Sequence, residues 1–149
     1  MASTNIDFDT HRHTLSDSAL GKAIGVSHLS WHFDERSTKQ LSGKVTSREI
    51  GPLRVSWIDM ALGLKHWRGA RREKELLACP EPYLTIVMPL NGTISLKGTS
   101  DAVEINRREL AIWDSTQILQ FEISTAGYEQ ISVLVPQRTL RATPEACAA

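Results

Sequence analysis

The feature that most constrains the fold is a run of short alternating segments between residues 83 and 114. Each segment places apolar and polar side chains in turn, which is the period-two pattern of a half-buried β-strand. The segments are residues 83–90, 93–97, 102–105 and 110–113. Asn91-Gly92 predicts a tight hairpin, because both residues tolerate positive φ, and residues 98–101 predict a further turn. We expect these segments to form an antiparallel sheet with one buried face.

Further alternating segments lie on both sides of this run. Residues 53–60 follow Gly51-Pro52 and predict a clear strand, residues 118–123 continue the sheet, and residues 130–135 predict a last strand stopped by Pro136. Counting gives about eight strands separated by short polar turns, with no long amphipathic helix between them. This order favours a barrel or a two-sheet sandwich of the jelly-roll kind over a βαβ fold.

Three other segments are less regular. Residues 26–33 are interpreted as a strand or an edge segment, and the polar stretch 34–51 predicts a loop or a weak edge strand. Residues 64–77 are rich in arginine, and we interpret them as a solvated strand edge or an exposed loop. The alternative is that one arginine of this stretch binds an anionic ligand, because a guanidinium can hold a carboxylate through two hydrogen bonds. The candidates are Arg68, Arg71 and Arg72.

The two ends of the chain are polar. The first residues predict an arm, and Asp17 can cap a short helix after it. At the other end, Thr143 and Pro144 announce a helix that has almost no chain left to form it. The expected organisation is an arm with a short helix over residues 1–34, a β domain over 35–140, and the start of a truncated C-terminal helix over 141–149.

Composition and charge narrow the class of protein. The 149 residues suit one domain with a real core, and 17 Lys and Arg balance 17 Asp and Glu. A protein that binds nucleic acid through phosphates usually carries a basic surplus, so this chain is not expected to bind DNA or RNA by itself. Cys79 and Cys147 form no CxxC pair and no disulfide framework. Without a signal peptide or an apolar stretch that could span a bilayer, the expected location is the cytoplasm.

Several strand and turn motifs together resemble a known family. They are Gly51-Pro52-Leu53-Arg54-Val55, the arginine-rich middle, Tyr83-Leu84, Leu90-Asn91-Gly92, the stretch Glu109-Leu110-Ala111-Ile112-Trp113-Asp114-Ser115, Val133-Leu134-Val135-Pro136 and Leu140. From about residue 33 to residue 140 the chain is similar to the N-terminal, cupin-like domain of AraC-type transcriptional regulators. Two departures are visible: Arg107-Arg108-Glu109 stands where the family usually has Pro-Gly-Asp, and the helix-turn-helix part is missing.

The resemblance carries expectations about fold and partners. It implies a mainly all-β, cupin-like jelly roll or double-stranded β-barrel with short flanking helices. It also implies a domain that binds a small-molecule effector and forms a homodimer, with DNA bound only through a helix-turn-helix domain that is absent here. Under that reading, effector binding alters how the arm and the dimer contacts pack. No membrane partner is expected.

The pattern of histidines argues against a catalytic metal. Cupin enzymes hold a metal with two or three His and a carboxylate on adjacent inner strands. None of the five His lies between residues 83 and 136, and neither a GxSxG motif nor a Cys–His pair supports a nucleophile. We therefore expect no metal, no cofactor and no catalysis. The alternatives are a metal-dependent cupin isomerase or dioxygenase, a stand-alone ligand carrier, and a barrel used only for dimerisation.

Aromatic residues are the candidates for the walls of a ligand site. A small barrel can enclose one small molecule between its sheets, although any single aromatic residue also suits plain core. Trp31 and Phe121 belong to the apolar residues that could supply such walls. The predicted ligand-binding residues are Trp57, Trp67, Arg68, Tyr83, Met88 and Trp113. The sequence does not identify the effector.

Overall fold

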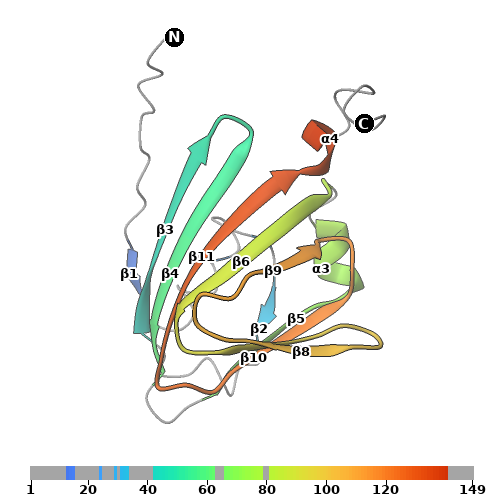
Figure 1. The fold of residues 1–149 in the computed structure, drawn as a ribbon. Helices are drawn as coiled ribbons and strands as arrows, with labels where there is room; N and C mark the ends of the chain where they lie inside the picture. Colours follow the sequence, from blue (N-terminus) through green and yellow to red (C-terminus); the bar gives the residue numbers. More distant parts are fainter. Residues whose placement is uncertain are drawn as a thin grey trace.

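The computed structural model describes residues 13–15, 24, 29, 31–33, 42–62, 66–78 and 81–140. These residues form two antiparallel sheets (Figure 1), which confirms the predicted mainly all-β fold. The larger sheet has the order β1-β3-β4-β11-β6-β9. Its strands are β1 (His13–Leu15), β3 (Ser42–Ile50), β4 (Leu53–Ala61), β11 (Gly127–Pro136), β6 (Tyr83–Asn91) and β9 (Ala111–Asp114).

The smaller sheet has the order β2-β5-β10-β7-β8. Its strands are β2 (His32–Phe33), β5 (Trp67–Arg71), β10 (Leu119–Ile123), β7 (Ile94–Lys97) and β8 (Ala102–Ile105). Two short helices accompany the sheets, α3 (Glu73–Ala78) after β5 and α4 (Gln137–Leu140) after β11. Among the described residues, no helix is long and apolar enough to cross a membrane.

Strand β11 is the centre of the larger sheet. It pairs with β4 on one side and with β6 on the other, and its side chains alternate strictly between buried and half-buried. The buried set points toward the smaller sheet, and Leu134 and Tyr128 of this set are only 1% exposed. The strand ends at Pro136, as predicted, because proline cannot donate to the next pair of the ladder.

The predicted hairpin at Asn91-Gly92 is wrong. Strand β6 lies in the larger sheet and β7 in the smaller one, so the turn between them is a corner that carries the chain from one sheet to the other. Asn91 is the last residue of β6, and among the two only Gly92 has positive φ, at 80°. The four segments between residues 83 and 114 are all strands, but they are divided between the two sheets.

Two segments are more regular than predicted. Residues 42–50 form β3, a nine-residue strand paired along its length with β4, instead of a loop or a weak edge strand. Residues 67–71 form β5, which lies inside the smaller sheet between β2 and β10, instead of a solvated edge or loop. Charged residues hid both strands: Lys44 and Glu49 of β3 and Arg68 of β5 are exposed, and Arg71 of β5 is charged although it is buried.

The turn that departs from the family pattern is tight. The Asn106 carbonyl accepts the Glu109 N–H at 3.0 Å, and the Glu109 carboxylate accepts the Asn106 N–H at 2.7 Å. Arg108 occupies the left-handed position with φ of 66°, which it adopts although it is not a glycine. The turn therefore forms without Pro-Gly-Asp, at the cost of backbone strain at Arg108.

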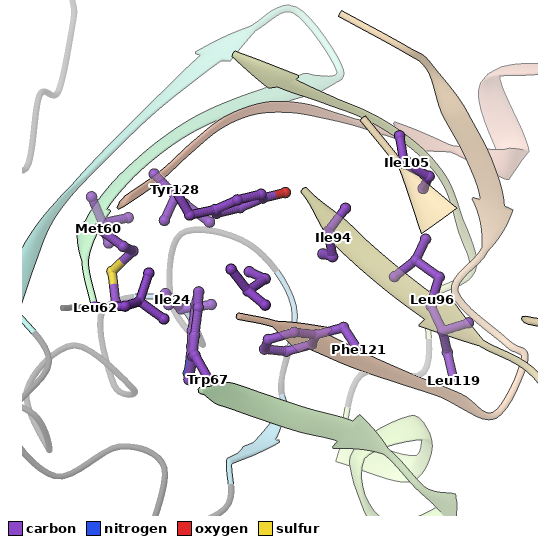
Figure 2. Packing of buried hydrophobic residues seen from close by; sticks show 13 residues of the cluster. Ile24, Met60, Leu62, Trp67, Ile94, Leu96, Ile105, Leu119, Phe121 and Tyr128 are labelled. Atoms are coloured by element: carbon purple, nitrogen blue, oxygen red, sulfur yellow. The ribbon is translucent and has the colours of Figure 1, made fainter. Parts of the chain in front are cut away.

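The core lies between the two sheets. Figure 2 shows Tyr128 and Met60 of the larger sheet reaching toward Trp67, Phe121 and Ile94 of the smaller sheet. Residues from the region predicted as an arm and short helix also take part: Ile24, within a helical turn, and Leu29 are buried, and Trp31 and Phe33 pack against the core. The rest of the predicted helix after Asp17 and the predicted helix start at Thr143 lie outside the described residues.

Candidate ligand-binding site

A small cavity lies inside the barrel, between the two sheets. Its volume is about 40 Å³. One wall is aromatic and consists of Trp31, Phe33, Trp67, Trp113 and Phe121. The other walls are mainly aliphatic and consist of Ile24, Ile58, Val87, Ile94, Leu96 and Ile123, with Gln130 as a polar member. The cavity is therefore an apolar chamber with few polar groups, which is the usual character of a small-molecule site.

The five aromatic rings form one continuous cluster. The Phe121 ring stands edge to face against Trp67 at a centroid distance of 4.9 Å and against Trp31 at 5.1 Å. Phe33 stacks on Trp67 at 5.5 Å with an interplanar angle of 22°, and Trp113 stands edge to face on Trp31 at 5.7 Å. Such arrangements are the favourable ones for aromatic pairs, so the wall is a well-packed surface and not a loose collection of rings.

Glycine at position 69 allows this packing. Gly69 lies on β5 opposite Phe121 of β10. A Cβ atom at Gly69 would lie 2.4 Å from Cε1 of Phe121, which is closer than carbon atoms can approach, and 3.2 Å from Cδ1 of Phe33, which is a tight contact. The absence of a side chain on β5 therefore makes room for two rings of the wall.

Polar groups at the cavity are few, and several are unpaired within the described part of the chain. The indole Nε1 atoms of Trp67 and Trp113 are buried and have no hydrogen-bond partner there. Gln130, only 6% exposed, accepts a short 2.5 Å hydrogen bond from the Tyr128 hydroxyl through Oε1. Burial raises the pKa of the Tyr128 hydroxyl far above its ordinary value, so this group stays a neutral donor.

A second layer of hydroxyl groups lies beside the cavity on the larger sheet. Ser56, Thr85 and Ser132 are completely buried. In the register of the sheet, Ser132 faces Ser56 on one side and the cavity-lining Val87 on the other. The Thr85 and Ser132 hydroxyls have no hydrogen-bond partner among the described residues, which is unusual for buried polar groups.

Arg71 supplies a positive charge close to the aromatic wall. Its side chain is completely buried at the end of β5 and donates a 3.2 Å hydrogen bond to the Ser115 carbonyl. The guanidinium carbon lies 5.8 Å from the centre of the Trp31 ring, within the range of a cation–π interaction. Arg71 was one of the three arginines considered as an anion-binding residue, and it is the one that lies inside the barrel.

The size of the cavity limits what it can hold without rearrangement. A volume of about 40 Å³ holds water molecules, whereas pockets for drug-sized ligands measure about 300–1,000 Å³. A larger ligand must displace a wall. One wall is formed by Trp31 and Phe33, and among the described residues β2 pairs with β5 through His32 and Phe33.

The six predicted ligand-binding residues fall into separate places. Trp67 and Trp113 line the cavity. Trp57 and Met88 flank Ile131 on the outer face of the larger sheet, and the Trp57 indole donates a 2.8 Å hydrogen bond to Glu129 there. Tyr83 lies at the start of β6, where its hydroxyl donates to Glu81 and its N–H to the Ser115 hydroxyl.

Arg68, the remaining predicted residue, lies on the outer face of the smaller sheet. That face carries an open groove of about 680 Å³ that Arg68 shares with Arg72 and Lys97. Arg68 donates a 3.0 Å hydrogen bond to Glu122, which lowers the pKa of that carboxyl group; the neighbouring His66, at 3.2 Å, lowers it further. The guanidinium of Arg68 is thus already engaged by a carboxylate of the same sheet.

No metal centre is evident in the described residues. Within those ranges, no group of three or more His, Cys, Asp or Glu side chains lies close enough to hold an ion. Of the five histidines, His66 is paired with Glu122 and His32 lies on the exposed outer face.

Sequence reasoning missed the polar member of the cavity and part of its wall. Gln130 sits among the buried positions of β11, where the alternation otherwise places Tyr128 and Leu134. A polar residue at an apolar position of a central strand is a signal that could have identified it. Phe33 was assigned to an uncertain segment, and only the pairing of β2 with β5 brings its ring to the cavity.

Among solved structures, the fold is similar to that of an AraC-like activator, and two cupin proteins match with lower scores. The AraC-like transcriptional activator CuxR matches with a TM-score of 0.65 at 11% sequence identity, over 85% of this chain and 48% of that protein. The Schizosaccharomyces pombe Cnp3 cupin domain matches with a TM-score of 0.48 and 9% identity, over 66% of this chain and 62% of that domain. A cupin 2 conserved barrel domain protein from Salinispora arenicola matches with a TM-score of 0.46 and 12% identity, over 62% of this chain and 75% of that protein.

The sequence itself identifies the family. No curated protein sequence matches the chain. The model of the AraC-binding-like domain matches residues 22–148, which include every described strand except β1 and all the residues that line the cavity. The chain spans about half the length of CuxR. It therefore belongs to the AraC-binding-like domain family.

Proposed function

We propose that this domain senses a small-molecule effector for a transcription regulator and holds it in the cavity between the two sheets. The observation that carries the proposal is an apolar cavity with an aromatic wall, in which the buried Trp67 and Trp113 N–H groups lack partners within the described residues. Buried polar groups are normally paired, so two unpaired donors on residues that line one cavity support a polar ligand atom there. Family membership supports the regulatory role.

Signalling requires that the effector favour one arrangement of the protein over another. A ligand with equal affinity for both arrangements shifts nothing, and a shift from about 1:99 to 99:1 needs about 5.5 kcal/mol of difference. The wall of Trp31 and Phe33 is suited to that task, because it belongs to the N-terminal segment and a bound molecule larger than the present cavity can displace it. In this proposal the effector changes how the N-terminal segment packs, and the full regulator transmits that change to its DNA-binding domains.

The proposal has three further parts. The domain acts as a homodimer in the cytoplasm, it contacts DNA only through a helix-turn-helix domain elsewhere in the regulator, and it performs no catalysis. Elemental analysis of the purified protein tests the last part, because stoichiometric iron, manganese or zinc would favour a cupin enzyme. Sedimentation analysis tests the dimer.

Tryptophan fluorescence provides a direct test of the binding site. Of the four tryptophans, Trp31, Trp67 and Trp113 line the cavity, whereas Trp57 lies on the outer face and is 47% exposed. The variant Trp57→Phe therefore leaves a protein whose emission reports on the cavity. A thermal-shift screen of small catabolites identifies compounds that raise the melting temperature, and the same compounds are expected to change the emission of Trp57→Phe.

A pair of matched variants locates the site. Val87→Ile adds one methyl group at the cavity, and Val133→Ile adds the same group on the outer face of the neighbouring strand β11. Compounds found in the screen should stabilise Val87→Ile less than the wild-type protein and Val133→Ile as much. Equal stabilisation of both variants would show that the compounds bind somewhere else.

A further inference from the structure

The polar groups around the cavity point to the chemical class of the ligand. We propose that the effector is a flat, largely apolar molecule that carries a carbonyl or carboxylate oxygen, and that this oxygen accepts hydrogen bonds from the Trp67 and Trp113 indoles. This inference rests on the proposed function, because it assumes that the cavity is the effector site.

The first step concerns the two indole groups. An indole N–H can only donate a hydrogen bond. Trp67 is 4% exposed, and the Nε1 atoms of both Trp67 and Trp113 are buried without a partner in the described residues. An unpaired buried donor is costly to the empty protein, so a ligand oxygen that accepts from it gains affinity. A ligand group that is itself only a donor gains nothing there.

The third polar group at the cavity completes a set of donors. The Gln130 amide accepts the Tyr128 hydroxyl through Oε1, so its remaining polar end is the NH₂ group. Gln130 lines the same cavity as the two indoles. Three side chains from three strands, Trp67 of β5, Trp113 of β9 and Gln130 of β11, therefore line one cavity, and each carries a hydrogen-bond donor.

The shape of the cavity favours a planar body. Phe33 stacks on the Trp67 ring, and the Phe121 ring stands perpendicular to it. A flat molecule that displaces Phe33 can take over this stacking without disturbing the other rings. Arg71 is buried and lies against Trp31 on the same wall, so a carboxylate is a useful comparison with a neutral carbonyl.

Three one-ring probes test the acceptor: toluene has none, benzaldehyde has a neutral carbonyl, and benzoate has a carboxylate. Phe33→Ala, with Phe33→Leu as a milder second variant, opens space for a ring beside Trp67. By titration calorimetry we expect benzaldehyde or benzoate to bind these variants at least about tenfold more tightly than toluene. A further preference for benzoate over benzaldehyde assigns a role to Arg71, and equal affinity of the two assigns recognition to the carbonyl oxygen alone.

Removing the donors separates this inference from the proposed function. Trp67→Phe and Trp113→Phe keep an aromatic ring but delete the N–H, and each should reduce the preference over toluene by at least about threefold. Trp57→Phe is the control and should leave the preference unchanged. Toluene binding as tightly as the oxygen-bearing probes, an unchanged preference in both indole variants, or no binding of any probe would overturn the inference. The Val87→Ile comparison tests the cavity as the effector site independently of these outcomes.

Discussion

The close contact of the aromatic wall with β5 can be tested by replacing Gly69 with alanine. The new Cβ atom would lie 2.4 Å from Cε1 and 2.9 Å from Cζ of Phe121. Carbon atoms in contact lie about 3.5–4.0 Å apart, so the ring must shift by about an ångström. Phe121 has little room to do so, because it is 7% exposed and packs against both Trp31 and Trp67.

We expect Gly69→Ala to lower the free energy of unfolding by about 1–2 kcal/mol. Overpacking a well-packed core costs about 1–3 kcal/mol. The reduced entropy of the unfolded chain offsets about 0.4–1 kcal/mol of that cost. Since each kcal/mol lowers the melting temperature of a chain of this size by about 2–4 °C, the expected decrease is roughly 2–8 °C.

Urea denaturation and thermal melts followed by far-UV circular dichroism measure this change, and near-UV circular dichroism reports the packing of the rings. Gly98→Ala is the matched control. A Cβ atom at Gly98 would approach only the Asp101 carbonyl, at 3.8 Å, and the backbone there has no positive φ. That variant should be neutral or slightly stabilised. If Gly69→Ala is as stable as Gly98→Ala, the rings do not pack on β5 as described.

Other features of the fold give predictions of defined sign. Burial raises the pKa of Tyr128 above its ordinary value of 10.0, so the folded protein keeps the hydroxyl proton at a pH where the unfolded chain loses it. The contribution of the neutral hydroxyl to the free energy of unfolding is therefore fully present below about pH 10 and is lost as the pH rises further. The melting temperature of the wild type should therefore fall above about pH 10, and that of Tyr128→Phe much less. Tyr128→Phe should also cost about 1–3 kcal/mol at neutral pH in urea denaturation, because the Gln130 oxygen loses its donor. Arg108→Gly should stabilise the protein by roughly 0.5–1 kcal/mol in urea denaturation, since relief of the left-handed strain exceeds the added entropy of the unfolded chain; Arg107→Gly should not stabilise. Gly92→Ala should destabilise by at least about 2 kcal/mol in the same assay, because φ is 80° and the Cβ atom would lie 2.6 Å from the Gly127 carbonyl oxygen.

The two faces of the larger sheet explain why the ligand-binding residues were difficult to choose. The half-buried outer face carries apolar side chains such as Ile86, Val133 and Val55, which stand in register across three strands. Trp57 belongs to this outer face and lies two residues further along β4 than Val55. Alternation identifies two faces of a strand, but when both are apolar it does not say which one encloses the cavity.

The sequence by itself determined most of the strands. Residues 53–60, 102–105 and 130–135 were predicted as strands and correspond to β4, β8 and β11, because period-two alternation between turn residues is a local property of the chain. The family was also evident from strand and turn motifs, and the match over residues 22–148 confirms it. The sequence also predicted the position of the tight turn at Gly92, because glycine is the residue that most easily adopts a positive φ.

Only the tertiary structure decided how the strands share two sheets and which side chains meet between them. Asn91-Gly92 suits a hairpin and a corner equally well, and pairing of β6 with β11 and of β7 with β10 selects the corner. The cavity joins Phe33, Trp67 and Gln130, which are far apart in the chain and belong to three strands. Their proximity depends on long-range pairing and on burial of the inner faces, and no local pattern encodes either of these.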